Sequence, residues 1–159
     1  RLEEARDLAT DGLIEVRYAL QALRPVQLTD FDGLATVTRL VTAFRKATQM
    51  EVELDLGDAP LYLGEEANTT VYRLVQEGLT NALRHGKATE VMITFAKVEN
   101  GVSINIKDNG AGSGSEGLKT GYGLVGMRER IESLGGELAV SGLPGEGFLL
   151  SAWLPLKEE

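Results

Sequence analysis

Three polar residues, Glu77, Asn81 and His85, recur every fourth position where an apolar helical pattern nears its end. Because successive residues of a helix lie about 100° apart, the three fall within roughly 80° of one another, along one flank of the apolar face. An acid and an amide at that border suit a hard cation such as Mg²⁺, which takes few protein oxygens and relies on water and substrate phosphates for the rest. Taken alone, the stripe is better explained as a solvated flank with an i, i+4 hydrogen bond, and His85 as a helix-end residue that interacts with the helix dipole.

A second group, Asp108-Asn109-Gly110-Ala111-Gly112, follows an alternating apolar segment. Asp108 has the parity of the apolar residues before it, so we expect it to continue the buried face as a carboxylate where the sheet ends. A buried carboxylate needs partners, and the amino group of a purine is a suitable donor. A tight turn that uses Asp, Asn and Gly for backbone reasons explains the same residues about equally well.

The third group is a glycine-rich approach to a helix, Gly121-Tyr122-Gly123-Leu124-Val125-Gly126-Met127. Exposed amides at a helix N-terminus, together with the helix dipole, make an anion site. Glycines let the backbone approach phosphate oxygens closely. The motif is neither a Walker loop nor a dinucleotide fingerprint, because no βαβ unit surrounds it.

The helices that would position these groups follow from hydrophobic periodicity. Spacings of three and four predict an amphipathic helix over residues 2–23, which Pro25 stops. Thr29 or Asp30 is expected to cap a second helix. The expected core residues of this second helix are Leu34, Val37, Leu40, Val41 and Phe44. A third helix is expected over about 64–85, with an inner stripe of Ala67, Val71, Leu74, Val75, Gly78 and Ala82.

The expected strands predict the fold class. Residues 50–56 alternate and predict a half-buried strand, and segments 91–98 and 102–108 flank an Asn100-Gly101 turn typical of a hairpin. The glycine-rich residues 109–122 are expected to be a mobile loop. A fourth helix over about 124–134 and two closing strands, 137–141 and 148–156, complete the order. Hairpins rather than βαβ alternation predict an α+β sandwich, with helices on one face of a mixed, mostly antiparallel sheet.

Composition excludes several classes of protein. The 159 residues carry 16 basic and 24 acidic side chains, a net charge of −8, which argues against a general nucleic-acid binder and against a polybasic membrane surface. The absence of cysteine excludes a disulfide framework, a thiolate metal site and a cysteine nucleophile, and fits a reducing cytoplasm. No apolar stretch is long enough to span a membrane. The start at Arg1, without Met or a signal-peptide pattern, leads us to expect a piece of a longer protein.

In their order along the chain, the three polar groups resemble the GHKL (Bergerat) ATP-binding fold. Within that fold the chain resembles the catalytic ATPase domain of sensor histidine kinases, particularly the NarL-partner branch typified by NarX and DesK. The matching motifs are residues 76–85 (QEGLTNALRH, the N box), 108–112 (DNGAG, the G1 box) and 121–130 (GYGLVGMRER, the G2 box). Upstream, Glu15-Val16-Arg17 and Leu23-Arg24-Pro25 resemble the end of that branch's dimerisation helix. The resemblance covers essentially the whole chain and implies a two-layer GHKL sandwich.

The resemblance also implies a role for each site residue. Asn81 would ligate Mg²⁺, and Glu77 sits where related ATPases keep a general base. Asp108 would accept a hydrogen bond from the adenine amino group, and Gly110 and Gly112 would let the chain turn beside the base. The remaining residues would lie near the phosphates: Arg84, His85, Gly121, Tyr122, Gly123 and the amide of Leu124, with Lys119 contributing from an ATP lid over residues 113–120.

Two departures from the family pattern bear on function. Phe148 stands where the family usually has a Thr whose hydroxyl supports the adenine site through water. The family's phospho-acceptor histidine would precede Arg1, and His85 belongs to the N box, so this chain is expected to bind ATP without completing autophosphorylation. Residues 1–25 would be the C-terminal part of the dimerisation and phospho-acceptor helix region, and residues 26–159 the catalytic domain.

The expected function is therefore the ATP-binding catalytic domain of a two-component sensor histidine kinase, with ATP and Mg²⁺ as cofactors. Its expected partners are the upstream phosphotransfer helices, in a homodimer, and a NarL-type response regulator, but no nucleic acid. We expect a cytoplasmic domain whose parent is attached to a membrane. Two alternatives remain: an anti-sigma-factor-type serine kinase or other GHKL ATPase, and a nucleotide-free regulatory module that acts through the surface of the first two helices.

Overall fold

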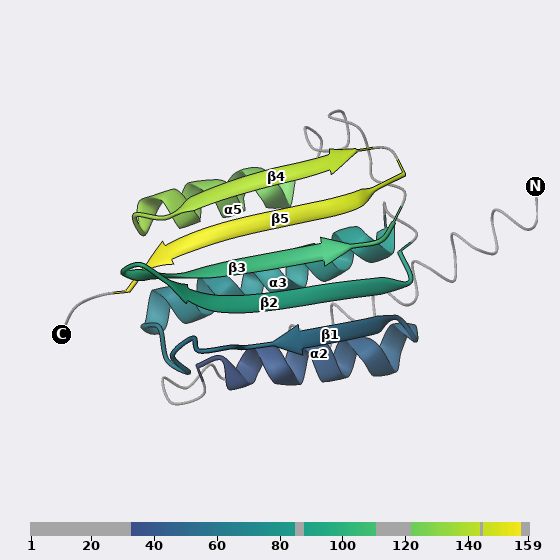
Figure 1. The fold of residues 1–159 in the computed structure, drawn as a ribbon, viewed down its shortest axis with the longest axis horizontal. Coiled ribbons are helices and arrows are strands. Elements are labelled where there is room, and N and C mark those ends of the chain that lie inside the picture. Colours follow the sequence, from purple (N-terminus) through teal and green to yellow (C-terminus); the bar gives the residue numbers. More distant parts are fainter. Residues whose placement is uncertain (1–32, 85–87, 111–121, 144, 157–159) are drawn as a thin grey trace, which may run out of the picture.

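The described residues form two layers, a five-stranded sheet and the helices that cover one of its faces (Figure 1). This computed structural model describes residues 33–84, 88–110, 122–143 and 145–156, so the helix expected over 2–23 and most of the glycine-rich loop lie outside it. The elements are α2 (Ala35–Thr48), β1 (Glu51–Asp55), α3 (Glu65–Arg84), β2 (Glu90–Val98), β3 (Gly101–Asp108), α5 (Tyr122–Ser133), β4 (Glu137–Leu143) and β5 (Gly147–Pro155).

The sheet is mixed and mostly antiparallel, as expected. Its strand order is β1-β2-β3-β5-β4; β1 and β2 run parallel, and the other neighbours are antiparallel. The predicted α+β sandwich, with helices on one face of a mixed, mostly antiparallel sheet, is therefore confirmed.

The hairpin between β2 and β3 is also confirmed, but its turn is not the Asn-Gly turn expected. Val98 pairs with Gly101, so the loop consists of Glu99 and Asn100, and Glu99 adopts a φ of 56°. Gly101 is a strand residue, and a Cβ there would lie 2.4 Å from Cε2 of the Trp153 ring. The close packing of β5 on β3, rather than the turn, requires this glycine.

Helix α2 begins later than a Thr29 or Asp30 cap would place it. Its N-cap is Leu34, which makes no capping hydrogen bond through its side chain. Instead the Leu34 N–H donates to the Leu61 carbonyl at 2.7 Å, and a Cβ on Gly33 would lie 2.0 Å from the same oxygen. The predicted cap was wrong because contact with the segment before α3, not a polar side chain, fixes the start of the helix.

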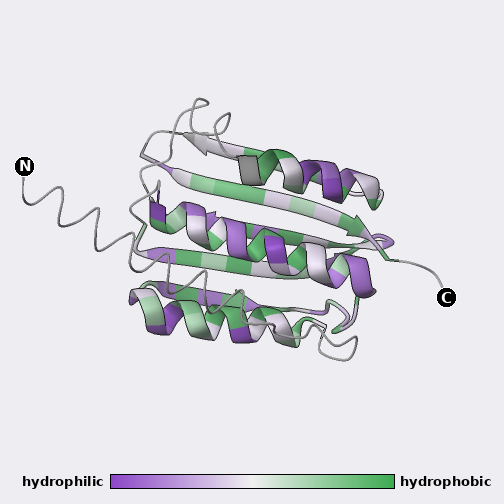
Figure 2. Ribbon diagram, turned by 180° about the vertical axis from the view of Figure 1, so that it is seen from behind, coloured by the Kyte–Doolittle hydropathy of each residue, from purple (hydrophilic) through white to green (hydrophobic). Residues whose placement is uncertain are grey.

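The core lies between the helices and the inner face of the sheet. The predicted core residues of α2 and α3 are buried, except Ala67, which is half-buried. On β2 and β3 the alternate inward residues are Val91, Ile93, Phe95, Val102, Ile104 and Ile106. Figure 2 shows the helices lying side by side over this face, with hydrophilic residues among those on their outward surfaces.

A close helix–sheet contact brings α3 onto the end of β3. Gly78 is buried, and a Cβ there would lie 2.8 Å from Cγ2 of Ile106. Ile106 is two residues before Asp108 on the same face of the strand. The glycine of the N-box motif therefore lets the polar flank of α3 lie close to the strand that carries Asp108.

The last helix ends as predicted, at Gly135-Gly136. Gly135 adopts a φ of 85°, and the Gly136 N–H donates to the Ile131 carbonyl at 2.9 Å, which closes the helix with a left-handed residue. Within the described ranges, no helix is both long and apolar enough to cross a bilayer.

Candidate functional site

Asp108 is the last residue of β3 and its carboxyl is directed into the protein. Only 5% of the residue is exposed, because it continues the inward parity of Ile104 and Ile106. It pairs with Val91 of β2 on one side and with Phe148 of β5 on the other. The predicted buried carboxylate at the end of the sheet is confirmed.

Two backbone amides hold the Asp108 carboxyl. The Gly110 N–H donates to Oδ1 at 2.9 Å, and the Phe148 N–H donates to the same carboxyl group from β5. Burial raises the pKa of Asp108 above its usual value, and the hydrogen bonds from Gly110 and Phe148 oppose that rise. Desolvation has the larger effect, so the carboxylate gains from any further donor.

The approach of β5 to this carboxylate depends on a glycine. Gly147 has a φ of 84°, and a Cβ there would lie 2.0 Å from the Asp108 carbonyl oxygen and 3.4 Å from Cα of Asn109. No larger residue fits without moving one strand from the other. Gly147 thereby brings the Phe148 N–H within reach of the Asp108 carboxyl.

The Asp108 site fits the amino group of a purine. A carboxylate offers about four lone-pair positions, and in the part of the chain that the structure describes two backbone N–H groups are seen to use them. A neutral N–H donor would satisfy a further position without adding charge to a buried site. This donor-poor, buried carboxylate therefore suits a base that presents an amino hydrogen.

The polar flank of α3 lies at the same end of the molecule. Glu77 and Asn81 are half-buried at the border of the apolar face, as predicted, and Arg84 is exposed in the last turn. After the helix, the Ala88 N–H donates to the Ala82 carbonyl at 3.3 Å, and the next residue, Thr89, hydrogen-bonds to Asn109. The C-terminal end of α3 and the end of β3 are thus tied together. His85 lies outside the described residues.

The start of α5 comes to this end as well. A groove at the opposite end of the helices is lined by Glu65 and Glu66 from the first turn of α3 and by Arg130 and Ser133 from the last turns of α5. The two helices therefore run antiparallel, which places the first turn of α5 near the C-terminal end of α3. That turn contains no acidic residue, so its amides and the helix dipole favour an anion.

The structure describes only some of the residues in the second and third groups and none of the expected lid over residues 113–120. Leu124 is buried in the first turn of α5, which also includes the backbone of Tyr122 and Gly123. Gly112, Lys119 and Gly121 lie outside the described residues.

Asn109 is a residue that the sequence did not single out. Its Oδ1 accepts hydrogen bonds from the backbone N–H groups of Thr89 and Glu90, both at 2.9 Å, and its Nδ2 donates to Oγ1 of Thr89 at 3.0 Å. The Asp-Asn-Gly sequence signals a turn, but it does not show that the amide reaches a strand that begins some twenty residues earlier.

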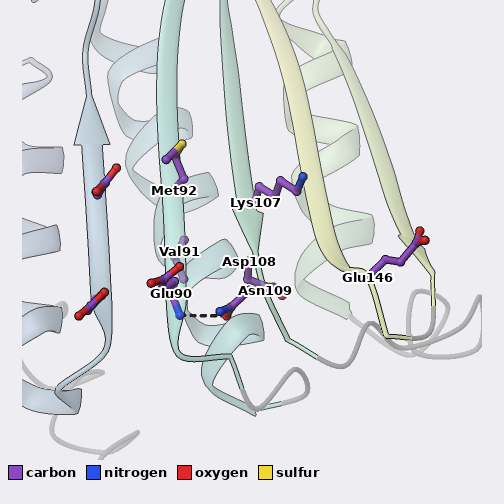
Figure 3. A pocket seen from close by; sticks show the side chains of 9 residues that line it. Glu90, Val91, Met92, Lys107, Asp108, Asn109 and Glu146 are labelled. Carbon is purple, nitrogen blue, oxygen red and sulfur yellow. Dashed lines mark hydrogen bonds between the residues drawn. The ribbon is translucent and has the colours of Figure 1, made fainter.

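A second hollow lies on the open face of the sheet, across from the helices. Met92 in this hollow is 50% exposed, and the hollow reaches the end of β3 (Figure 3). The residues that line it are Glu51, Glu53, Glu90, Val91, Met92, Lys107, Asp108, Asn109 and Glu146. Within the described ranges, no three His, Cys, Asp or Glu residues gather closely enough to hold a metal ion.

Comparisons with known proteins agree with this geometry. Residues 66–158 match the family described as histidine kinase-, DNA gyrase B-, and HSP90-like ATPases. The chain is 32% identical over 162 residues to the signal transduction histidine-protein kinase/phosphatase DegS of Brevibacillus brevis, and 31% identical over 160 residues to the sensor histidine kinase LiaS of Bacillus subtilis. These matches include 99% and 100% of this chain, which spans only 42% and 44% of the two relatives.

Solved structures show the same fold. The Acinetobacter baumannii histidine kinase AdeS superposes with a TM-score of 0.65 at 24% identity, over 97% of this chain and 77% of that one. A histidine kinase domain from the Erythrobacter litoralis EL346 blue-light activated histidine kinase gives 0.62 at 23% identity, over 77% of this chain and 60% of that one. The family match contains all three motif groups and more than half of the chain. The chain belongs to the family of histidine kinase-, DNA gyrase B-, and HSP90-like ATPases.

Proposed function

We propose that this domain binds MgATP and presents it for phosphoryl transfer to a histidine, as the catalytic domain of a two-component sensor histidine kinase. One observation carries the proposal: the buried Asp108 carboxyl, with its raised pKa and spare acceptor capacity, lies at the same end as Asn81 and the start of α5. The adenine base would lie at Asp108, Mg²⁺ and the phosphate chain at Asn81, and phosphate oxygens at the start of α5. The relatives named as histidine kinases support the choice of this reaction.

In the proposed complex, Asp108 accepts a hydrogen from the adenine amino group, and Gly110 and Gly112 let the chain turn beside the base. The Asn81 amide oxygen is a hard ligand of the kind that Mg²⁺ takes, with Glu77 on the same flank at the position of a general base. Bound Mg²⁺ would neutralise charge on the phosphates. We assign phosphate contacts to Arg84, His85, Lys119, Gly121, Tyr122, Gly123 and the amide of Leu124.

The reaction would break the bond between the γ-phosphorus and the bridging oxygen of ATP and form a phosphorus–nitrogen bond on histidine, releasing ADP. The domain contributes by positioning and by electrostatic stabilisation. The acceptor would belong to an upstream dimerisation helix, because the single histidine of this chain, His85, is assigned to the phosphates. An aspartate of a response regulator would then receive the phosphoryl group.

Finer features of the parent protein are part of the same proposal. Leu23-Arg24-Pro25 and the run from Gly126 to Arg130 favour the NarL-partner branch, with a NarL-type regulator as partner. We assign residues 1–25 to the end of the dimerisation region and residues 26–159 to the catalytic domain, in a homodimeric parent attached to a membrane. The absence of cysteine is compatible with a cytoplasmic location for this domain.

Calorimetric titration with a non-hydrolysable ATP analogue, with and without Mg²⁺, tests the nucleotide part of the proposal. We expect Mg²⁺ to strengthen binding to the wild-type chain and to have much less effect on Asn81→Ala. Thr69→Ala, near the start of the same helix, is the matched control and should bind like wild type. A folded wild-type chain that does not bind the analogue would contradict the proposal and favour a nucleotide-free interaction module.

The transfer step needs the full-length parent kinase. Incubation with γ-labelled ATP should produce a phosphoprotein that is labile in acid and stable in base, as phosphohistidine is. A product stable in acid would indicate a serine kinase on the same fold.

A further inference from the structure

We infer that Asn109 is a positioning residue for adenine recognition, because its side chain ties the end of β3 to the start of β2 and so fixes the amide that orients the Asp108 carboxylate. This inference rests on the proposed nucleotide site and deepens it. Asn109 itself need not touch the nucleotide.

Both polar atoms of the Asn109 side chain take part in this tie. Its oxygen accepts from two backbone N–H groups, those of Thr89 and Glu90, and its nitrogen donates to the Thr89 hydroxyl. Only the amide oxygen can accept hydrogen bonds, so the two N–H donors determine which way round the amide lies. In Figure 3 the side chain of Asn109 points toward the backbone of Glu90.

The backbone of Asn109 makes a further bond to the same place. Its N–H donates to the Glu90 carbonyl at 3.2 Å, so residue 109 is anchored to β2 through both main chain and side chain. Asn109 is exposed, and each of these bonds competes with water. Their combined effect is to hold one residue in a defined position rather than to stabilise the whole fold.

The consequence for Asp108 follows from chain connectivity. Asn109 is the single residue between Asp108, which carries the carboxylate, and Gly110, whose N–H donates to Oδ1 of that carboxylate at 2.9 Å. The second amide donor, Phe148, belongs to β5 and is held by strand pairing. Of the two donors that aim the carboxylate, the Gly110 amide is therefore the one whose position depends on Asn109.

The same tie links the two halves of the proposed site. Thr89 follows Ala88, whose N–H donates to the Ala82 carbonyl in α3, next to Asn81. The Asn109 amide thus also connects the strand with the proposed adenine acceptor to the end of the helix with the proposed metal ligand.

The test separates recognition of the base from the stability of the domain. Affinities are measured by calorimetry for ADP and for purine riboside diphosphate, which is the same nucleotide without the amino group. In the wild-type chain ADP should bind more tightly, because only ADP carries the amino group that donates to Asp108. For Asn109→Ala we expect this preference to shrink about tenfold, mainly through weaker ADP binding.

Two further variants make the result specific. Asn109→Asp retains an oxygen that accepts from both N–H groups, so it should recover most of the preference. Asn105→Ala, on the open face of the same strand, removes the acceptor of the Ser151 hydroxyl on the opposite face from Asp108 and should leave the preference unchanged. Thermal unfolding of the ligand-free variants checks that each is folded.

The outcomes distinguish the inference from the proposed function. If the wild-type chain binds neither nucleotide, the proposed function fails. If the wild-type chain prefers ADP and Asn109→Ala keeps the same preference, the positioning role is overturned and the nucleotide site stands. The same conclusion follows if Asn109→Asp loses as much of the ADP preference as Asn109→Ala does. Should Asn109→Ala not fold, Thr89→Val breaks only the Nδ2 bond and must reduce the preference by a smaller factor for the inference to survive.

Discussion

Gly147→Ala should destabilise the domain far more than Gly145→Ala, although both glycines have nearly the same backbone conformation. Their φ angles are 84° and 82°, so the left-handed backbone conformation costs alanine a similar strain energy at either position, about 1–2 kcal/mol. They differ in their surroundings: a Cβ on Gly145 meets no atom within 4 Å, whereas one on Gly147 would lie 2.0 Å from the Asp108 carbonyl oxygen. The comparison therefore isolates the close approach of β5 to β3.

The additional loss of stability in Gly147→Ala can be estimated from the cost of overpacking. Forcing a methyl group into a filled site costs about 1–3 kcal/mol beyond the backbone strain. The total for Gly147→Ala is then about 2–5 kcal/mol, against about 1–2 kcal/mol for Gly145→Ala. Because a domain is stable by only about 5–15 kcal/mol, this is a large fraction of the whole.

Equilibrium unfolding in urea measures both variants. With an m-value of about 2 kcal/mol per molar, the midpoint should fall by about 0.5–1 M for Gly145→Ala and about 1–2.5 M for Gly147→Ala. Gly147→Ala should also weaken ADP binding, because relief of the clash moves Phe148 away from Asp108. Equal midpoint shifts in the two variants would refute the reasoning, since the steric contact would then contribute nothing.

Two other predictions concern the contact between Gly78 and Ile106 and the buried Asp108 carboxyl. Gly78→Ala should destabilise the domain by about 1–3 kcal/mol, because its Cβ would lie 2.8 Å from Cγ2 of Ile106. In a double-mutant cycle measured by urea unfolding, Gly78→Ala combined with Ile106→Ala should lose much less stability than the sum of the two single losses. Strictly additive losses would contradict the contact. Because burial raises the folded-state pKa of Asp108, the folded protein binds more protons than the unfolded chain between the ordinary and the raised pKa, so the free energy of unfolding falls as pH rises through that window. Asp108→Asn should therefore stabilise the ligand-free domain at pH 7 but not below the ordinary carboxyl pKa, and a variant equally destabilised at every pH would argue against a desolvated carboxylate.

Helices α2 and α3 and strands β1 to β3 could be predicted from the sequence because they have a clear hydrophobic period. The inner stripe of α3 and the alternation that makes Asp108 the last inward residue of β3 are local patterns, and both are present in the structure. The start of α2 could not be predicted, since it depends on the Leu61 carbonyl, a contact between segments that are distant in the sequence. For the same reason Gly101 was assigned to the turn, although its packing against Trp153 is what requires a glycine.

The functional side chains of the site could be identified from the sequence, but the residues that hold them in position could not. Asp108 stood out because a carboxylate on a buried face is unusual, whereas Asn109 looked like an ordinary turn residue. Its function depends on the backbone of Thr89 and Glu90, which pattern analysis cannot place beside it. Gly147 belongs to a short Gly-Glu-Gly sequence that indicates a turn, and only the paired strands show that it faces the Asp108 carbonyl.

The central claim is that Asp108 recognises the base of ATP, and the most direct test is titration of Asp108→Asn with the Mg²⁺ complex of a non-hydrolysable ATP analogue. Asparagine keeps the size of the side chain but replaces a carboxylate oxygen with an amide that donates hydrogen bonds. We predict at least about a tenfold loss of affinity relative to wild type, in a variant that remains folded. Wild-type affinity in a folded Asp108→Asn chain would contradict the account and require that the nucleotide, if bound, be recognised elsewhere.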